Sequence, residues 1–153
     1  MTVAYKLLAA SDHELFDGML RLFGDVFEEP DSYLGAVPSR RYVESLLADR
    51  HFIAIVAVSG GTVFGALAAY VLDKFEQERK EAYLYDLAVA SDHRRRGIAT
   101  ALIGELKEVA RKRGCYVIFV QADQGDTPAI RLYESLGTRE EAVHFDIPVA
   151  GSP

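Results

Sequence analysis

The segment from Leu84 to Thr100, LYDLAVASDHRRRGIAT, changes from a strand pattern to a helix pattern within a few residues. It begins with apolar, β-branched and aromatic residues up to Val89, which predict a buried strand. After a polar turn and Gly97, apolar residues recur at helical spacing from Ile98 onward, which predicts a helix. The first amides of such a helix have no partner inside it, and the helix macrodipole adds positive potential there. The segment therefore predicts a site for an anionic phosphate group.

Two common phosphate-binding patterns are excluded, because the chain contains neither GxxxxGK nor GxGxxG. The predicted loop instead carries three arginines, Arg94, Arg95 and Arg96, directly before Gly97. A basic run at a helix start is usually a solvated surface, but this one lies beside the expected phosphate site. Because Gly97 has no Cβ, a ligand can approach its backbone closely.

Two motifs resemble those of the GNAT superfamily of acetyl-CoA-dependent N-acetyltransferases. Residues 94–99, RRRGIA, resemble the family's R/Q-x-x-G-x-G/A pyrophosphate loop, and residues 126–137, DTPAIRLYESLG, resemble its second CoA motif, N-x-x-A-x-x-x-Y-x-x-x-G. Asp126 departs from the family's usual Asn. The resemblance implies acetyl-CoA as the cofactor, bound by Leu87, Ala88, Val89, Arg94, Arg95, Arg96, Gly97, Ile98, Ala99, Thr100, Asp126, Ala129 and Tyr133.

The order of predicted elements indicates a mixed α/β sheet with helices on both faces, built as one domain over residues 1–153. Strands are expected at 3–8, 52–59, 62–72, 81–89, 116–122 and 141–149, and helices after Asp12, after Ser39, over 97–113 and after Asp126 or Thr127. Residues 27–38, with two prolines and a glycine, are expected to form an irregular loop. The resemblance implies the GNAT fold, with about six to seven strands and a V-shaped splay between the fourth and fifth.

The charge balance bears on the partner, because 17 basic and 23 acidic residues leave a net charge of −6. This argues against nucleic acid as a partner and fits a cationic substrate, although an acidic surface kept for solubility explains it equally well. No run approaches the roughly 20 apolar residues of a membrane helix. Cys115 is the only cysteine, so a cytoplasmic location is expected, and its thiol is expected to be packed rather than reactive. The histidines lack metal-ligand spacing, so no metal is expected.

Acyl transfer from a thioester to an amine requires a neutral amine, donors for the oxyanion and a proton for the leaving thiolate. Asp86 is the candidate base, because it is a carboxylate within an apolar strand; a static counter-ion for a substrate ammonium is the alternative. In a regular strand Asp86 faces away from Glu81 and Tyr83, whereas a bulge would change that parity. The resemblance implies that Tyr133 is the acid, pointing its hydroxyl at the CoA sulfur. A backbone amide near Leu87–Val89 is expected to stabilise the oxyanion.

Longer stretches resemble gentamicin-type aminoglycoside 3-N-acetyltransferases, among them GALAAYVL at 65–72, KFEQ at 74–77, VQAD at 120–123 and HFDI at 144–147. This resemblance implies acetylation of the 3-amino group on the 2-deoxystreptamine ring, and hence antibiotic resistance. Aminoglycosides carry several ammonium groups, so their site should offer several carboxylates. The candidate substrate-binding residues are Asp86, Asp123, Asp146, Glu81, and Glu28, Glu29 and Tyr33 of the loop at 27–38.

Three other functions stay open. A polyamine or small-amine acetyltransferase would use the same residues, and a peptide N-acetyltransferase would need an open groove. A non-catalytic acetyl-CoA-binding module would need neither Asp86 nor Tyr133, so their presence argues against it. Enzymes of this kind are often dimers, which leaves a homodimer open here.

Overall fold

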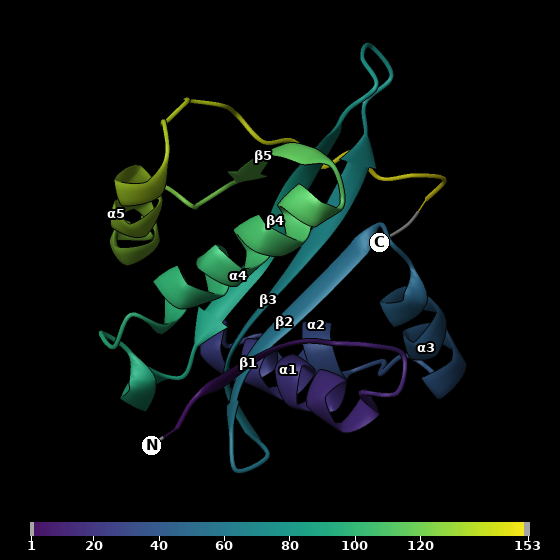
Figure 1. Ribbon diagram of the computed structural model, residues 1–153, viewed down its shortest axis with the longest axis vertical. Coiled ribbons are helices and arrows are strands. Elements are labelled where there is room, and N and C mark those ends of the chain that lie inside the picture. The colour runs from purple at the N-terminus through teal and green to yellow at the C-terminus, as the bar shows by residue number, and fades with distance from the viewer. Residues whose placement is uncertain (1, 152–153) are drawn as a thin grey trace. The chain divides into compact units, whose positions relative to one another are not determined.

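The computed structural model describes residues 2–151 in two compact units, which divide between Gln121 and Ala122. The first unit contains all the strands and most of the helices, and the second contains the last helix (Figure 1). The elements are β1 (Ala4–Leu7), α1 (His13–Val26), α2 (Pro30–Leu34), α3 (Arg40–Ala48), β2 (Phe52–Ser59), β3 (Thr62–Asp73), β4 (Lys80–Val89), the 3-10 turn η1 (Ser91–His93), α4 (Ile98–Lys112), β5 (Cys115–Val120) and α5 (Thr127–Leu136).

The five strands form one mixed sheet in the order β1-β2-β3-β4-β5. The first four are paired antiparallel, and β5 runs parallel to β4. The predicted mixed α/β class is confirmed, but the described residues hold five strands rather than the expected six to seven. A parallel neighbour requires a crossover, and α4 supplies it between β4 and β5.

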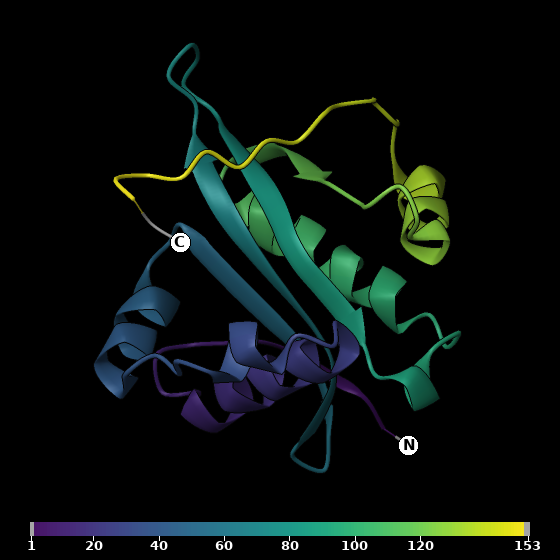
Figure 2. The same cartoon turned by 180° about the vertical axis from the view of Figure 1, so that it is seen from behind.

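Helices cover both faces of the sheet, as the sequence predicted. On one face, apolar side chains of α1 and α3 pack against alternate residues of β2 such as Phe52, Ala54 and Val56. On the opposite face lies α4, in front of the strands in Figure 1 and behind them in Figure 2. The buried side of α4 consists of Ile98, Leu102, Ile103, Leu106 and Ala110.

The beginning of α4 lies close to the sheet because β3 has a glycine beneath it. A Cβ added to Gly65 would lie 2.9 Å from Cγ2 of Ile98, the first residue of the helix, and 3.3 Å from Cδ1 of Leu102. The other end of α4 is tied to β2, because Nη1 of Arg113 donates to the carbonyl of Phe52 at 2.7 Å. Packing and this hydrogen bond therefore fix both ends of the helix on the sheet.

A β-bulge interrupts β4. Ala68 of β3 pairs with Asp86, whereas the next residue, Ala69, pairs with Leu84, so Tyr85 has no partner opposite it. Side chains normally alternate between faces, and one extra residue reverses that order beyond the bulge. Tyr85 and Asp86 consequently lie on the same face of the sheet, where both line one cavity.

Beyond the bulge, β4 and β5 separate. Their pairing runs from Lys80 opposite Cys115 to Leu84 opposite Val120, where β5 ends. β4 continues to Val89 and stays paired with β3 on its other side. This is the splay expected between the fourth and fifth strands, and it leaves one backbone edge of residues 85–89 without a strand partner in the described chain.

Two local predictions were wrong. The loop at 27–38 contains the short helix α2, which begins at Pro30, where the missing N–H of proline is tolerated. The alternating residues 141–149 form no strand, although Val143, Phe145 and Ile147 alternate as a half-buried strand would. A strand needs hydrogen bonds from a neighbouring backbone, and no ladder forms over 141–149 in the described part of the chain.

The helix caps were largely predicted correctly. Ser39 caps α3, because its Oγ accepts from the amide of Tyr42 at 3.1 Å, and Asp126 caps α5. Asp12 precedes α1 as expected, but its carboxylate accepts from the amide of Ala9 and from Lys6 instead of capping the helix. None of the described helices has the length and apolar character needed to span a membrane.

Candidate active site

A cleft of about 320 Å³ lies between the sheet and helices α1–α3 in the first unit. Its volume falls at the lower end of the range for small-molecule sites, roughly 300–1,000 Å³. Most of its wall is apolar or aromatic, and Asp86 is the one carboxylate in the lining. The lining residues are Phe16, Met19, Leu20, Phe23, Ser32, Tyr33, Leu46, Phe52, Ala68, Tyr70, Tyr85 and Asp86.

Asp86 reaches this cleft because of the bulge in β4, and it is half-buried there. Burial is the main cause that raises the pKa of Asp86 above its ordinary value; a hydrogen bond from Tyr33 lowers it, and the charge of Glu29 raises it. The hydroxyl of Tyr33 donates to Oδ2 of Asp86 at 2.9 Å. A carboxyl whose pKa is raised by an apolar cleft is a better proton acceptor once ionised, as a general base requires.

Aromatic rings continue from the cleft across the sheet. Tyr70 contacts Phe52 and Tyr85, with ring centroids 5.4 and 5.5 Å away, and Tyr85 contacts Tyr83 at 5.6 Å. Tyr83 then stacks on Phe119 of β5 at 4.5 Å. Flat apolar surfaces with polar edges of this kind suit a sugar or another ring that carries hydroxyl and amino groups.

The predicted phosphate loop connects η1 to α4. Arg95 and Gly97 both have left-handed backbone angles, with φ of 63° and 75°. A Cβ added to Gly97 would meet no atom within 4 Å, so the space above this residue is open. The left-handed backbone angle favours glycine at this position, and the open space fits the close approach of a ligand.

The start of α4 has no side chain that caps it, so its first amides are available to an anion. Arg94 is used locally, since its Nε donates to the carbonyl of Val89 at 3.3 Å and ties the loop to the end of β4. Arg95 and Arg96 are exposed beside it. An uncapped helix start with adjacent arginines fits a phosphate-bearing cofactor, as predicted from residues 84–100.

The edge of β4 after the bulge completes this half of the site. Leu87, Ala88 and Val89 are paired with Leu67, Ala66 and Gly65 of β3, respectively. Their opposite edge has no strand partner in the described chain, because pairing with β5 stops at Leu84, so backbone groups there can pair with an extended ligand. The cavity with Asp86 and the phosphate loop are therefore joined by one continuous strand segment.

The acidic loop residues have different positions. Tyr33 lines the cleft, and Glu29 lies at the N-terminus of α2, near enough to affect the pKa of Asp86. Glu28 is exposed, with a left-handed backbone (φ of 55°) after α1. Glu81 lies outside the cleft lining: Tyr116 donates to its carboxylate at 2.7 Å, and Lys74 is 3.6 Å away. The substrate-binding roles of Glu28, Glu29 and Glu81 stay predictions.

Five candidate residues belong to the second unit. Asp126 accepts from the amide of Ala129 at 3.2 Å as the cap of α5, and the carbonyl of Tyr133 accepts from the amide of Gly137. Asp146 pairs with His144 at 2.8 Å, and the carbonyl of Asp123 accepts from the amide of Asp126. The roles of these residues toward cofactor or substrate stay predictions.

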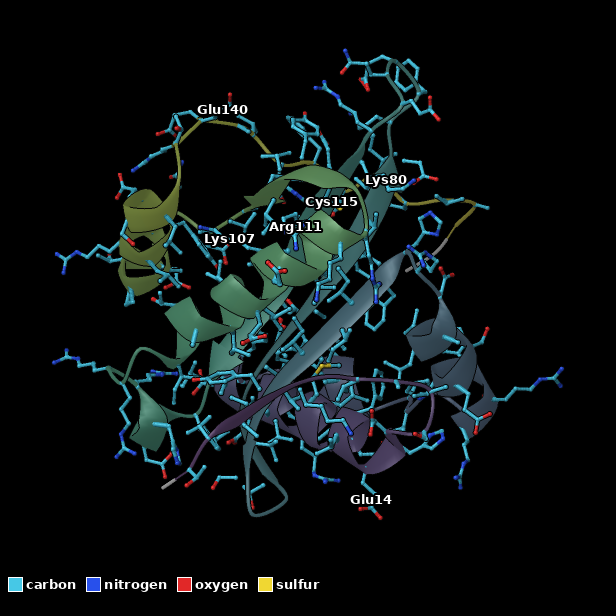
Figure 3. The ribbon with its side chains drawn as sticks, in the orientation of Figure 1. Glu14, Lys80, Lys107, Arg111, Cys115 and Glu140 are labelled. Carbon is cyan, nitrogen blue, oxygen red and sulfur yellow. The ribbon has the colours of Figure 1, made fainter. Side chains whose placement is uncertain are left out.

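The sequence did not single out Tyr70, Phe52, Phe16 or Met19 as parts of a site. Each lies in an apolar periodic pattern that also describes core residues, so no sequence signal separates the two roles. Cys115 begins β5 opposite Lys80 of β4 (Figure 3) and is partly buried, and burial raises the pKa of its thiol. A raised pKa leaves less of this thiol in the nucleophilic thiolate form. Among residues 2–151, no group of three or more potential metal ligands is assembled.

Comparison with known protein families gives one match that spans most of the chain. The profile described as the acetyltransferase (GNAT) family matches residues 14–138. The chain belongs to the acetyltransferase (GNAT) family. Members of this family transfer an acetyl group from acetyl-CoA, and the loop at 94–97, the uncapped start of α4 and the free edge of β4 suit that cofactor.

Curated relatives of this GNAT protein are N-acetyltransferases. N-acetyltransferase 8B of Rattus norvegicus is 32% identical over 102 residues, which make up 67% of this chain and 46% of that protein. The [ribosomal protein bS18]-alanine N-acetyltransferase of Escherichia coli K12 is 33% identical over 79 residues, or 52% of each chain. The chain therefore spans about half the length of the curated relatives it matches.

Two solved structures that match nearly the whole chain are aminoglycoside acetyltransferases. One such enzyme, from an uncultured soil metagenomic sample, is 51% identical with a TM-score of 0.95, over 98% of this chain and 100% of that one. A second metagenomic enzyme, solved in complex with sisomicin, is 32% identical with a TM-score of 0.87, over 96% of both chains.

Proposed function

We propose that this GNAT protein acetylates aminoglycosides on the 3-amino group of the 2-deoxystreptamine ring and thereby confers resistance to them. The observation that carries the proposal is the cleft at the β4 bulge, where Asp86 is the one carboxylate in a lining rich in aromatic side chains. A ring that bears an amine matches this chemistry, because the ring packs on the tyrosines and the amine meets Asp86. The 51% identical aminoglycoside acetyltransferase supports the same substrate class.

Asp86 acts on the amine in two ways. At neutral pH an aminoglycoside amine carries a proton, and an ionised carboxylate attracts the ammonium to the cleft. The amine must then lose a proton to expose its lone pair, and Asp86 is the acceptor, either directly or through one water. Oxygen Oδ2 is bound by Tyr33, so the amine approaches the other oxygen of the carboxylate.

The cofactor half of the site binds acetyl-CoA through its phosphates and its extended arm. The amides at the start of α4, with Arg95 and Arg96, hold the phosphates, and the edge of β4 at 87–89 pairs with the arm. When bound, acetyl-CoA supplies the activated acetyl group. Tyr133, with Asp126 and Ala129 of the same motif, provides the remaining contacts, and its hydroxyl gives a proton to the leaving thiolate.

A peptide N-acetyltransferase is the second candidate function, and the observation that favours it is the 33% identity to the bS18-alanine enzyme. The two functions differ in the acceptor that each must accommodate. A protein N-terminus brings a length of backbone, whereas the cleft described above is small and lined mainly by apolar side chains. The cleft therefore favours a compact acceptor.

The test is release of CoA thiol from acetyl-CoA with sisomicin, gentamicin, spermidine and an Ala-initiated peptide offered separately. We expect rapid release with the two aminoglycosides and little with the others. Release with spermidine or the peptide alone would contradict the substrate class while retaining the family's chemistry. If none of the four amines causes release of CoA thiol, although the protein still binds acetyl-CoA, a non-catalytic binding module would be favoured.

A further inference from the structure

Tyr33 is held in place by packing that does not involve a substrate. It lies on the short helix α2, and its ring contacts the rings of Phe23 and Phe27 at the end of α1, with centroids 5.7 and 5.8 Å away. Phe23 and Phe27 are stacked on each other at 5.6 Å. Two fixed rings therefore set the orientation of the third, and the hydroxyl at its far end points in a defined direction.

That hydroxyl meets Asp86, a residue of a different element, at the wall of the cleft. The hydroxyl donates to Oδ2 of Asp86 at 2.9 Å, and the bond is partly buried. A hydrogen bond to a carboxylate is stronger than one between neutral groups, and partial removal from water strengthens it further. The contact thus joins the sheet to α2 at the carboxylate that we assign to proton transfer.

The groups around Asp86 act on its charge in opposite directions. Burial, the largest cause, and the charge of Glu29 on the N-terminal side of α2 raise the pKa of Asp86, whereas the bond from Tyr33 lowers it. Tyr70 of β3 and Tyr85 of β4 also line the cleft, and the pKa of Tyr70 is raised by burial. Tyr33 is itself kept protonated, because burial and the neighbouring Asp86 raise its pKa.

We propose that Tyr33 is a positioning residue, whose hydroxyl fixes one oxygen of Asp86 and leaves the other for the incoming amine. This inference rests on the proposed function, in which Asp86 meets the amine, and it replaces the substrate-binding role predicted for Tyr33. A tyrosine that donated to a hydroxyl or carbonyl of the substrate would need its hydroxyl hydrogen for that purpose. Here that hydrogen is already donated to Asp86.

The alternative is that Tyr33 only anchors α2 to α1 through its ring. The variant Tyr33→Phe separates the two roles, because the phenyl ring keeps its contacts with Phe23 and Phe27 and loses only the hydroxyl. Tyr85→Phe is the matched control. It removes a hydroxyl from the same cleft wall, and no bond from Tyr85 to Asp86 is present among the described contacts.

The first measurement is the titration of Asp86 in the ligand-free protein, followed by NMR of the ¹³C-labelled side-chain carboxyl. Without the bond from Tyr33, the ionised carboxylate loses its donor, so the midpoint in Tyr33→Phe should move to higher pH. The midpoint in Tyr85→Phe should stay with that of the wild type. Equal midpoints in all three proteins would overturn the proposal, and this test needs no substrate.

The second measurement is the pH dependence of acetyl transfer to sisomicin. In Tyr33→Phe the limb that rises with pH should move to higher pH in step with the NMR midpoint, and kcat should fall about tenfold. KM for sisomicin should change much less than kcat. A rise in KM alone would mean that Tyr33 contacts the substrate and would overturn the proposal. A shifted NMR midpoint in an enzyme inactive toward sisomicin would support the Tyr33–Asp86 contact and contradict the proposed function instead.

Discussion

At the scale of single residues, Asp86 carries most of the chemistry of the proposed site. Its side chain is half-buried among apolar groups, and Tyr33 contacts it at 2.9 Å. Because burial raises the pKa of Asp86, the folded protein holds its proton more tightly than the unfolded chain does. Ionisation of Asp86 therefore lowers the free energy of unfolding. This loss is absent at pH values well below the pKa of Asp86 in the unfolded chain, and it reaches its full size above the pKa in the folded protein.

Asp86→Asn should therefore reduce activity without reducing stability at alkaline pH. We expect kcat to fall about a hundredfold or more, because the base is lost. The thermal midpoint at pH 8 should equal or exceed that of the wild type, since Asn still accepts from Tyr33 but is never ionised. At the lowest pH at which both proteins fold, the difference in thermal midpoint between Asp86→Asn and the wild type should disappear. A lower midpoint at pH 8 would contradict the account, and a change in KM for the amine alone would make Asp86 a counter-ion.

Tyr133→Phe tests the proposed acid. The ring remains and only the hydroxyl is lost, so binding of acetyl-CoA should stay nearly unchanged while kcat falls about a hundredfold. Tyr42→Phe, at an exposed residue of α3, is the matched control and should behave as the wild type. Turnover at the wild-type rate in Tyr133→Phe would remove the acid role from this residue.

At the scale of elements, the position of α4 links the sheet to the phosphate loop. The helix starts one residue after Gly97, and its first residue, Ile98, packs over Gly65 of β3. Any change that lifts the beginning of α4 also moves the amides that we assign to the cofactor's phosphates. Sheet packing and cofactor affinity are therefore coupled at this point.

Gly65→Ala should weaken both stability and acetyl-CoA binding. The added Cβ would lie 2.9 Å from Ile98 and 3.2 Å from the Cβ of Ala57, so it overpacks the contact, at a cost of about 1–3 kcal/mol in the free energy of unfolding. Gly104→Ala, on helix α4, is the control, because its added Cβ meets nothing within 4 Å and should stabilise the protein by about 0.5–1 kcal/mol. Denaturant unfolding measures the change in stability, and calorimetric titration measures the affinity for acetyl-CoA. An unchanged affinity in Gly65→Ala would contradict the proposed coupling between sheet packing and cofactor binding.

Some elements could be predicted from the local sequence pattern alone. The strand, loop and helix of residues 84–100 were predicted correctly, because the spacing of apolar residues changes from a strand pattern to a helix pattern at the point where the arginines and Gly97 occur. A bulge in this strand was left open as an alternative to regular alternation, and its place at Tyr85 depends on the register between β3 and β4. That bulge puts Asp86 on the face of the sheet that lines the cleft. The geometry of the site therefore depends on a shift in strand register that no sequence pattern shows.

At the scale of the whole molecule, the sequence predicted the family and the mixed sheet but not every strand. The strand expected at 141–149 had a correct alternating pattern, yet pattern alone does not supply a neighbouring backbone. The cleft lining was also beyond prediction, because aromatic residues distant in sequence, such as Phe16 and Tyr70, meet only after folding. The net charge of −6 agrees with a cationic substrate at this scale, and by itself it selects no particular amine.

The most direct test of the proposed function is the structure of the product formed from sisomicin and acetyl-CoA, determined by mass spectrometry and two-dimensional NMR. The account predicts a single added acetyl group on the 3-amino nitrogen of the 2-deoxystreptamine ring. An acetyl group on another nitrogen would contradict the assigned position while keeping the substrate class. The absence of any acetylated sisomicin, under conditions in which the protein binds acetyl-CoA, would contradict the aminoglycoside account as a whole.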